Sequence, residues 1–289
     1  MLDNRNFPSQ AFLSTKKLKD HAVKDVLVTT NLGVTYGRNL DQVEAIRKID
    51  FIARQGEFIC IVGPSGCGKT TLLKSLAGLL EPTKGETFVN GKKVDGPPSD
   101  LALVFQEYTR SLLPWLTVEK NITFPLHAKG ITKEEIHNRS TNALEEVGLS
   151  GFAKKFPWQL SGGMQQRVAI ARAIAYQASV LLMDEPFASV DAQTRADLED
   201  LVLKIQRDSG VTIVFVTHDI DESIYLADRV VVLTQRPTTV KREFDIDLIK
   251  PRDQITTKSH PDFIKLRAEV IGLIQNERSK NHLENENIK

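Results

Sequence analysis

The sequence predicts an α/β fold in which a parallel β-sheet carries helices on both of its faces. The first observation is a series of continuous apolar runs of strand length, at residues Phe58–Val62, 101–105, 180–183, Thr212–Val216 and 230–233. Such runs are typical of strands that are buried on both faces of a sheet. The second observation is that helical patterns alternate with these runs, which favours parallel strands joined by helical crossovers.

The residues before the first buried run have a strand-like pattern of another kind. Apolar pieces occur there at residues 26–28, 33–37 and 43–46. Further on, residues 86–94 enclose Asn90-Gly91, a pair typical of the tight turn of a β-hairpin. We expect antiparallel strands in this part, preceded by a loosely ordered lead-in over residues 1–24.

A further segment, which starts at Thr132, has the signature of a helix. Thr132 and Glu135 have the spacing of a capping box. The apolar face of the helix that follows holds Ile136, Ala143, Leu144 and Val147. This pattern predicts that residues 107–160 form a helical insertion between strands of the main sheet.

The C-terminal extension, residues 245–289, is predicted to contain one helix. Pro261 and Asp262 open it, and its apolar face holds Phe263, Leu266, Val270 and Ile274. Two roles are open for this extension: packing on the core or a regulatory contact.

Composition argues against several classes of protein. The 38 Lys and Arg residues are balanced by 37 Asp and Glu, a net charge of +1, whereas a nucleic-acid binder usually has a basic excess. The two cysteines, Cys60 and Cys67, are seven residues apart, which favours free thiols in a reducing compartment. The apolar runs are far shorter than the ~20 residues of a membrane-spanning helix. A role at a membrane would therefore need a partner protein.

One glycine-rich segment matches the pattern of a phosphate-binding loop. It consists of Gly63, Pro64, Ser65, Gly66, Cys67, Gly68, Lys69 and Thr70, and Thr71 follows it. The segment follows a buried strand and opens a helix, so backbone N–H groups and the helix N-terminus can face one anion. Lys69 is expected to reach the β and γ phosphates of a nucleotide, and the hydroxyl of Thr70 to bind Mg²⁺.

Two acidic residues end the apolar run at residues 180–183. Asp184 is the second candidate ligand of Mg²⁺, because a carboxylate at that strand end can reach the cation of the phosphate loop. Glu185 is expected to point the other way along the alternating backbone and to act on an attacking water as a general base. The alternative is a solvated acidic turn.

A second potential anion site lies further along the chain. Ser161 is a natural N-cap, and Gly162 and Gly163 leave N–H groups exposed at the start of the helix that contains Gln165. Because the phosphate loop already holds the phosphates within one chain, this second site suggests a γ phosphate presented by another subunit. The alternative is an ordinary capped helix.

Three single residues are weaker candidates. Gln106 follows an apolar run and could reach the metal or the water, although a Gln at a strand end is often only surface. His218 closes the strand Thr212–Val216 and could donate to the γ phosphate, or be structural. Tyr36 could stack on adenine, or pack on its own strand.

In this order, these residues resemble the ATP-binding-cassette (ABC) ATPases over residues 26–240. The resemblance implies a P-loop NTPase (RecA-like) core with an antiparallel β subdomain and a helical insertion subdomain, within a domain that covers residues 25–244. It also implies that ATP lies between two domains, with the phosphate loop of one facing the Ser161–Gly163 helix of the other. Asp191 matches the loop that couples the two sites across the dimer, and the resemblance favours functional roles for Gln106, His218 and Tyr36.

Several segments are similar to the ATPases of nitrate, sulfonate and taurine importers. They are the segments at residues 112–118, 183–187, 191–195 and 260–267. Other relatives import bicarbonate or thiamine-precursor pyrimidines. The chain departs from its closer relatives at Ala188-Ser189-Val190, where they usually have Gly-Ala-Leu, and this departure weakens the choice of subfamily.

The resemblance therefore implies an energy-coupling ATPase, with ATP and Mg²⁺ as cofactors, on the cytoplasmic face of a bacterial inner membrane. Its expected partners are a second ATPase copy, membrane permease subunits and, indirectly, an external solute-binding protein, with no nucleic acid. The apolar stretch Leu112–Leu116, with Trp115 exposed on the helical lobe, is the candidate contact with the permease. The alternative is that Trp115 packs inside the lobe. A soluble ABC ATPase and a non-hydrolysing subunit are weaker alternatives, and the solute cannot be read from this chain.

Overall fold

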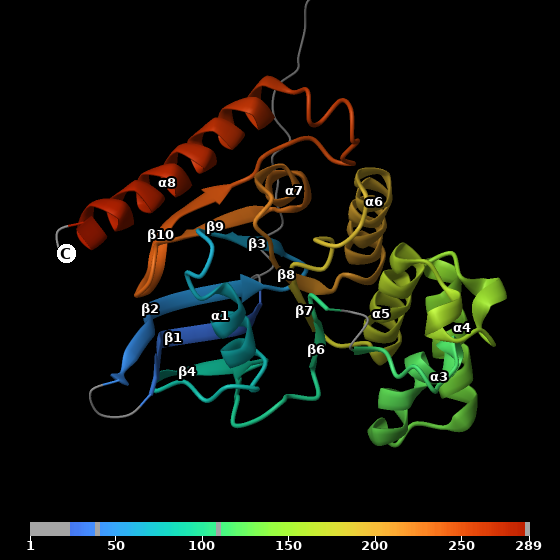
Figure 1. The fold of residues 1–289 in the computed structure, drawn as a ribbon. Helices are drawn as coiled ribbons and strands as arrows, with labels where there is room; N and C mark the ends of the chain where they lie inside the picture. The colour runs from blue at the N-terminus through green and yellow to red at the C-terminus, as the bar shows by residue number, and fades with distance from the viewer. Residues whose placement is uncertain (1–23, 38–40, 108–110, 287–289) are drawn as a thin grey trace, which may run out of the picture.

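The computed structural model describes residues 24–37, 41–107 and 111–286, with side chains up to residue 279. Except for Lys24, the lead-in predicted for residues 1–24 lies outside the described residues. Within them, one ten-stranded sheet forms the centre of the molecule, in the order β5-β4-β1-β2-β10-β9-β3-β8-β7-β6 (Figure 1).

The apolar runs form the strands of one half of the sheet, and these strands are parallel, as predicted. It contains β6 (Leu101–Val104), β7 (Val180–Asp184), β8 (Thr212–Val216), β3 (Phe58–Val62) and β9 (Arg229–Leu233). Every residue of β3, β7 and β8 is buried, as the continuous apolar runs require. Parallel strands end at one edge of a sheet, so the segments that follow β3, β6, β7 and β8 meet there.

The other half of the sheet is mainly antiparallel. It consists of β1 (Asp25–Tyr36), β2 (Val43–Arg54), β4 (Lys84–Val89), β5 (Lys92–Lys93) and β10 (Thr238–Asp245). The apolar pieces at residues 26–28 and 33–37 belong to the single strand β1, which is irregular near Asn31, where φ is +53°. Asn90 and Gly91 both have positive φ between β4 and β5, which confirms the predicted hairpin turn.

Helices cover both faces of the sheet. On one face α1 (Lys69–Leu76) packs through Leu72, Leu73 and Leu76 into the core shared with β1 and β2. On the other face lie α6 (Ala192–Ser209), α7 (Ile220–Leu226) and α8 (Pro261–Glu286), which contribute to a second core. Cys60 belongs to the second core and Cys67 to the first; both are buried with free thiols, as expected.

A helical lobe stands beside the sheet and consists of α3 (Val118–Thr123), α4 (Lys133–Glu146) and α5 (Gly162–Tyr176), with a 3₁₀ helix at Phe124–Lys129 (Figure 1). Thr132 caps α4 by accepting a hydrogen bond from the Glu135 amide, while the Glu135 carboxylate binds Arg139. The predicted apolar face of α4 is buried against α5. No helix among the described residues is long and apolar enough to traverse a bilayer.

The C-terminal extension is attached to α6 and α7 by polar contacts as well as by its apolar face. Phe263 and Val270 of α8 are fully buried. Arg252 donates to the carbonyls of Ile224, Tyr225 and Ala227 at the end of α7. Lys258 binds the buried carboxylate of Glu199 on α6 at 3.0 Å. Of the two roles left open by the sequence, the structure shows packing on the core.

Candidate nucleotide-binding site

The phosphate loop connects β3 to α1 in a tight curl. The Cys67 amide donates to the carbonyl of Pro64 at 3.2 Å, and Gly66 and Gly68 have φ of +74° and +110°. A side chain at either position would be strained. At Gly68 a Cβ would in addition contact Thr238 and Ala45. The glycines are therefore needed for the shape of the loop itself.

Lys69 is the buried cation of this loop, with 7 % of its surface exposed. Its Nζ donates to the carbonyls of Gly63 at 3.1 Å and Pro64 at 3.3 Å, and lies 3.9 Å from the Glu185 carboxylate. The positive charge is thus held over the loop, where an anion would bind.

Thr70 and Asp184 bring two oxygen groups together at the end of β7. The Thr70 hydroxyl donates to Oδ1 of Asp184 at 3.4 Å, and burial raises the pKa of this carboxyl, opposed by the Thr70 hydrogen bond. A hydroxyl and a carboxylate are ligands that suit Mg²⁺, which takes its remaining ligands from phosphates and water. The two residues therefore fit the predicted metal site.

Glu185 lies at the centre of the predicted catalytic group. Its Oε2 is 2.9 Å from Nδ1 of His218 and accepts from Nε2 of Gln106 at 3.4 Å. The sequence predicts that strand alternation directs this side chain, but in the structure a turn of the backbone directs it. Glu185 has φ of +42°, and its amide donates to the carbonyl of Val216 at 2.8 Å. That left-handed turn brings Glu185 to the same cavity as Lys69 and Thr70.

Part of the phosphate loop and the residues around Glu185 line one open cavity of about 460 Å³. Its walls are Ser65, Gly66, Gly68, Lys69, Thr70, Thr71, Gln106, Glu185, His218 and Arg236. Tyr36 stands next to it, partly exposed, with its hydroxyl 3.1 Å from that of Thr71. The ends of the parallel strands thus bring together residues that are as far apart in sequence as Gly66 and Arg236.

The second anion site lies on the helical lobe and does not line this cavity. Ser161 caps α5 by accepting from the Met164 amide at 3.3 Å, and Gln165 donates to the carbonyl of Leu160. Gly163 lies so close to α6 that a Cβ would be 2.5 Å from the Thr194 methyl. Within one chain, the structure thus places the start of α5 against the start of α6.

Asp191 caps that start of α6. Its carboxylate accepts from the Thr194 amide at 3.0 Å and from the Thr194 hydroxyl at 2.6 Å. These hydrogen bonds hold the pKa of Asp191 below its usual value. Asp191 and Gly163 therefore both lie against Thr194. The start of α6 and the start of α5 thus form one surface.

Two residues that the sequence did not indicate, Arg236 and Thr238, also bind the phosphate loop. Arg236 donates to the carbonyl of Gly66 at 3.0 Å. The hydroxyl of Thr238 donates to the carbonyl of Cys67. No sequence pattern marks these residues, because their role depends on pairing β9 and β10 beside a loop that precedes them by about 170 residues.

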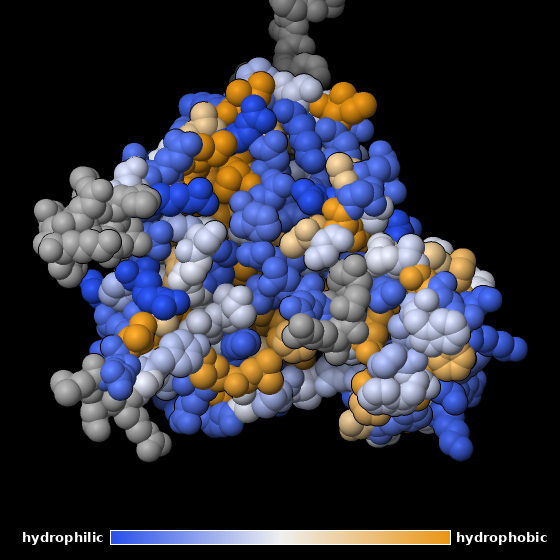
Figure 2. Space-filling model, viewed as in Figure 1, coloured by the Kyte–Doolittle hydropathy of each residue, from blue (hydrophilic) through white to orange (hydrophobic). Residues whose placement is uncertain are grey.

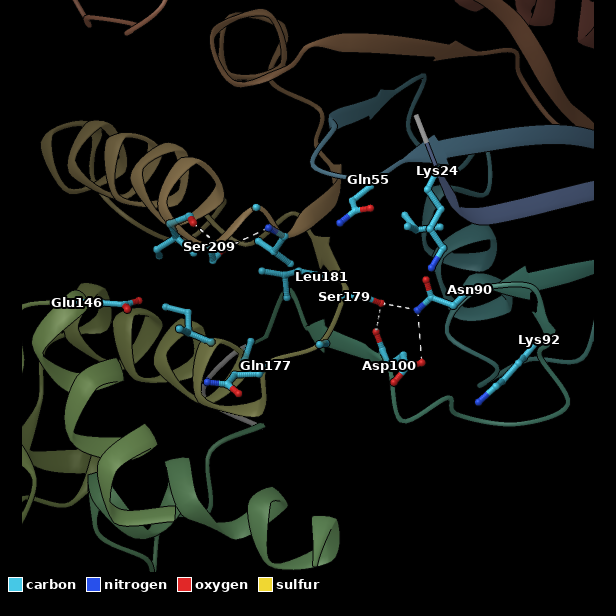
Figure 3. A pocket seen from close by; sticks show the side chains of 17 residues that line it. Lys24, Gln55, Asn90, Lys92, Asp100, Glu146, Gln177, Ser179, Leu181 and Ser209 are labelled. Atoms are coloured by element: carbon cyan, nitrogen blue, oxygen red, sulfur yellow. Dashed lines mark hydrogen bonds between the residues drawn. The ribbon is translucent and has the colours of Figure 1, made fainter. Parts of the chain in front are cut away.

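Another cavity, of about 740 Å³, lies at the opposite ends of the parallel strands (Figure 3). In it Asn90 donates to Ser179 Oγ at 2.8 Å and to the Asp100 carboxylate at 3.4 Å, while Lys24 and Glu146 line other walls. Its polar groups carry charges of both signs and share no residue with the phosphate loop, so it does not belong to the nucleotide site.

The loop at residues 111–117 presents Trp115 to solvent. Trp115 is 70 % exposed, so the alternative that it packs inside the lobe is wrong. The fully buried Asn121 supports this loop, because it accepts from the Leu113 amide and donates to the carbonyls of Leu113, Leu116 and Thr117. Figure 2 shows a mainly hydrophilic face on which apolar residues also surface along the edge of this lobe.

Known proteins that are similar to this chain identify its family. Residues 46–188 match the family described as ABC transporter. An uncharacterised ABC transporter ATP-binding protein of Methanocaldococcus jannaschii is 46 % identical over 259 residues, which cover 90 % of this chain and 95 % of the relative. The nitrate import ATP-binding protein of a Synechocystis strain is 41 % identical over 256 residues, covering 86 % and 95 %. The taurine import ATP-binding protein of Roseobacter denitrificans is 39 % identical over 239 residues, covering 82 % and 88 %.

A solved structure with the same fold is a dimeric ATP-binding cassette in a post-hydrolysis state, bound to ADP and Pi. It superimposes with a TM-score of 0.67 at 33 % identity, covering 76 % of this chain and 98 % of that one. This likeness confirms the predicted P-loop NTPase fold. The chain belongs to the ATP-binding proteins of ABC transporters.

Proposed function

We propose that this chain hydrolyses ATP to energise a bacterial importer of the nitrate, sulfonate or taurine type. Membership of the ABC family implies ATP binding and an ATPase activity coupled to transport. The observation that carries the catalytic part is the convergence of Lys69, Gln106 and His218 on the Glu185 carboxylate beside the phosphate loop.

The residues of the site have separate roles in hydrolysis. The loop amides and Lys69 bind and orient the phosphates, and Tyr36 offers its ring to the adenine. Thr70 and Asp184, with Gln106 beside them, would hold Mg²⁺, which neutralises charge on the β and γ phosphates. Glu185 accepts the proton of the attacking water, and His218 fixes the carboxylate through its 2.9 Å contact.

A second copy of the chain is proposed to complete the site. Ser161, Gly162 and Gly163 provide an anion site at the start of α5, and this site lies away from the phosphate loop of its own chain. A γ phosphate held by the partner would fill it, with Gln165 and Asp191 close to the contact. The dimeric state of the solved relative supports this arrangement.

The transported solute is inferred from relatives alone. Nitrate and taurine import proteins are about 40 % identical to this chain over most of its length, and bicarbonate and thiamine-precursor pyrimidines are the alternatives. The proposed partners are permease subunits, reached through Trp115, and an external solute-binding protein reached through them. This assignment places the chain on the cytoplasmic face of the inner membrane.

The proposal is tested by comparing wild type with Glu185→Gln, with and without ATP and Mg²⁺. We expect Glu185→Gln to bind ATP, to lose at least ~99 % of its turnover when a general base is removed, and to elute as an ATP-dependent dimer in gel filtration. Lys69→Ala is the control that should lose nucleotide binding. Equal hydrolysis by a monomer in wild type and Glu185→Gln would exclude the binding of ATP between two copies.

A further inference from the structure

The phosphate loop depends on donors from the segment that joins β9 to β10. A loop that turns its N–H groups inward toward phosphates turns carbonyls outward, where side-chain donors from other segments can bind them. The Gly66 carbonyl accepts from Nη2 of Arg236 at 3.0 Å, and the Cys67 carbonyl accepts from the fully buried Thr238. Two successive carbonyls are therefore bound by residues two positions apart.

The segment that supplies these donors is itself held in place. The Thr234 amide donates to the Thr239 carbonyl at 3.0 Å, and the Thr239 amide donates to the Thr234 hydroxyl at 2.9 Å. These bonds close the turn around Arg236 and fix where its side chain leaves the backbone. The guanidinium is consequently presented to the loop by a closed turn.

Arg236 differs from Thr238 because it also lines the nucleotide cavity. Its neighbours in the cavity wall include Ser65, Gly66 and Lys69. A guanidinium has five N–H donors in a planar fork and keeps its positive charge at every physiological pH. The bond to Gly66 uses one donor, so others remain for a ligand in the cavity.

Among the residues that the structure describes, Lys69 and Arg236 are the lysine and arginine that line the cavity. Lys69 is buried in the wall of the cavity, whereas Arg236 is exposed. Two cations at different depths suit a ligand with negative charge spread along a chain, such as a nucleoside polyphosphate.

We infer that Arg236 is a further nucleotide-binding residue, which contacts the phosphate chain while it holds the Gly66 carbonyl. The inference rests on the proposed function, since it assumes that ATP occupies the cavity. It predicts that the guanidinium contributes through its charge as well as by supporting the loop.

The test measures the affinities of ATP, ADP and adenosine for Arg236→Gln and Arg236→Lys by calorimetric titration. Gln removes the charge and leaves a shorter, neutral amide, so ATP and ADP should bind about 5- to 20-fold more weakly, as loss of a charge-assisted hydrogen bond implies. Adenosine binding should be unchanged. Lys keeps the charge and should recover most of the ATP affinity.

Arg242→Gln is the matched control, because it removes the same charge from β10 at a position that does not line the cavity. Equal ATP affinities for Arg236→Gln and Arg242→Gln would overturn the inference. Equal losses for ATP and adenosine in Arg236→Gln would also overturn it, by showing that the loss does not act through the phosphates. If Lys69→Ala binds ATP as wild type does, the proposed function itself fails.

Discussion

At the scale of single residues, the backbone of Glu185 decides how the site is assembled. A residue other than glycine in the left-handed region costs on the order of 1–3 kcal/mol, and here the bond from its amide to Val216 offsets part of that cost. As a result, one carboxylate lies beside Lys69, Gln106 and His218. Strain of this kind is typical of positions where geometry serves a reaction.

Removal of the metal provides a test of Asp184. In wild type, EDTA should weaken ATP binding, because Asp184 and Thr70 would hold the Mg²⁺ that neutralises phosphate charge. Asp184→Asn weakens the metal site, so the effect of EDTA on ATP affinity should shrink to within about threefold, since a neutral amide is a poorer Mg²⁺ ligand. Calorimetric titration with and without EDTA measures both effects. An unchanged EDTA effect in Asp184→Asn would remove Asp184 from the metal site.

Glu222 predicts a dependence of stability on pH. Its carboxyl on α7 is buried, and burial raises its pKa from 4.5 to about 8, with Glu199 and Asp219 adding to this increase and Thr217 and Arg195 opposing it. The folded protein therefore holds a proton that the unfolded chain releases above pH 4.5. Stability falls as the pH rises from about 4.5 to about 8.

Glu222→Gln should remove this penalty. Relative to wild type, its free energy of unfolding should rise between about pH 5 and pH 8, by on the order of 4 kcal/mol at most, since each tenfold difference in proton affinity corresponds to about 1.4 kcal/mol. Urea denaturation at several pH values measures the difference. The exposed Glu145→Gln is the control and should run parallel to wild type. A pH-independent difference for Glu222→Gln would contradict the raised pKa of this carboxyl.

At the scale of elements, the helical lobe is organised around a loop that lacks regular structure. Trp115 is exposed on this loop. Asn121, one turn into α3, binds the backbone of that loop at three residues. The loop is consequently as rigid as the helix that supports it.

Asn121→Ala should lower the free energy of unfolding by about 2–4 kcal/mol, because it leaves several buried backbone groups without partners. The measurement is urea denaturation of the isolated chain. Asn138→Ala, on the exposed side of α4, is the control and should change stability by less than about 0.5 kcal/mol. A loss below about 1 kcal/mol for Asn121→Ala would show that water replaces its bonds.

At the scale of the whole molecule, the two anion sites of one chain lie on different units. The phosphate loop belongs to the sheet, and the start of α5 belongs to the helical lobe, where Gly163 contacts α6. This separation supports the proposal that ATP is bound between two copies of the chain. The C-terminal extension contacts α6 and α7. These helices begin shortly after Asp191 and His218, so the extension supports the elements that follow these two site residues.

Trp115 provides a test of the proposed permease contact. Trp115→Ala should reduce the fraction of the chain that floats with membranes of cells expressing the whole transporter about tenfold, as loss of a central aromatic anchor implies. Its ATP affinity should stay unchanged. Trp158→Ala is the matched control, since Trp158 is a similarly exposed tryptophan (69 %) of the same lobe. Equal flotation of the two variants would exclude Trp115 from the contact.

Local patterns in the amino-acid sequence are enough to predict the elements and most of the site. Buried parallel strands appear as continuous apolar runs, caps such as Thr132 and Ser161 act over three residues, and the phosphate loop is one contiguous segment. Two features became visible only in the folded chain: Glu185 enters the site through a left-handed turn, and Arg236 and Thr238 bind the phosphate loop. They depend on contacts between residues far apart in the chain, and a local pattern carries no information about such contacts.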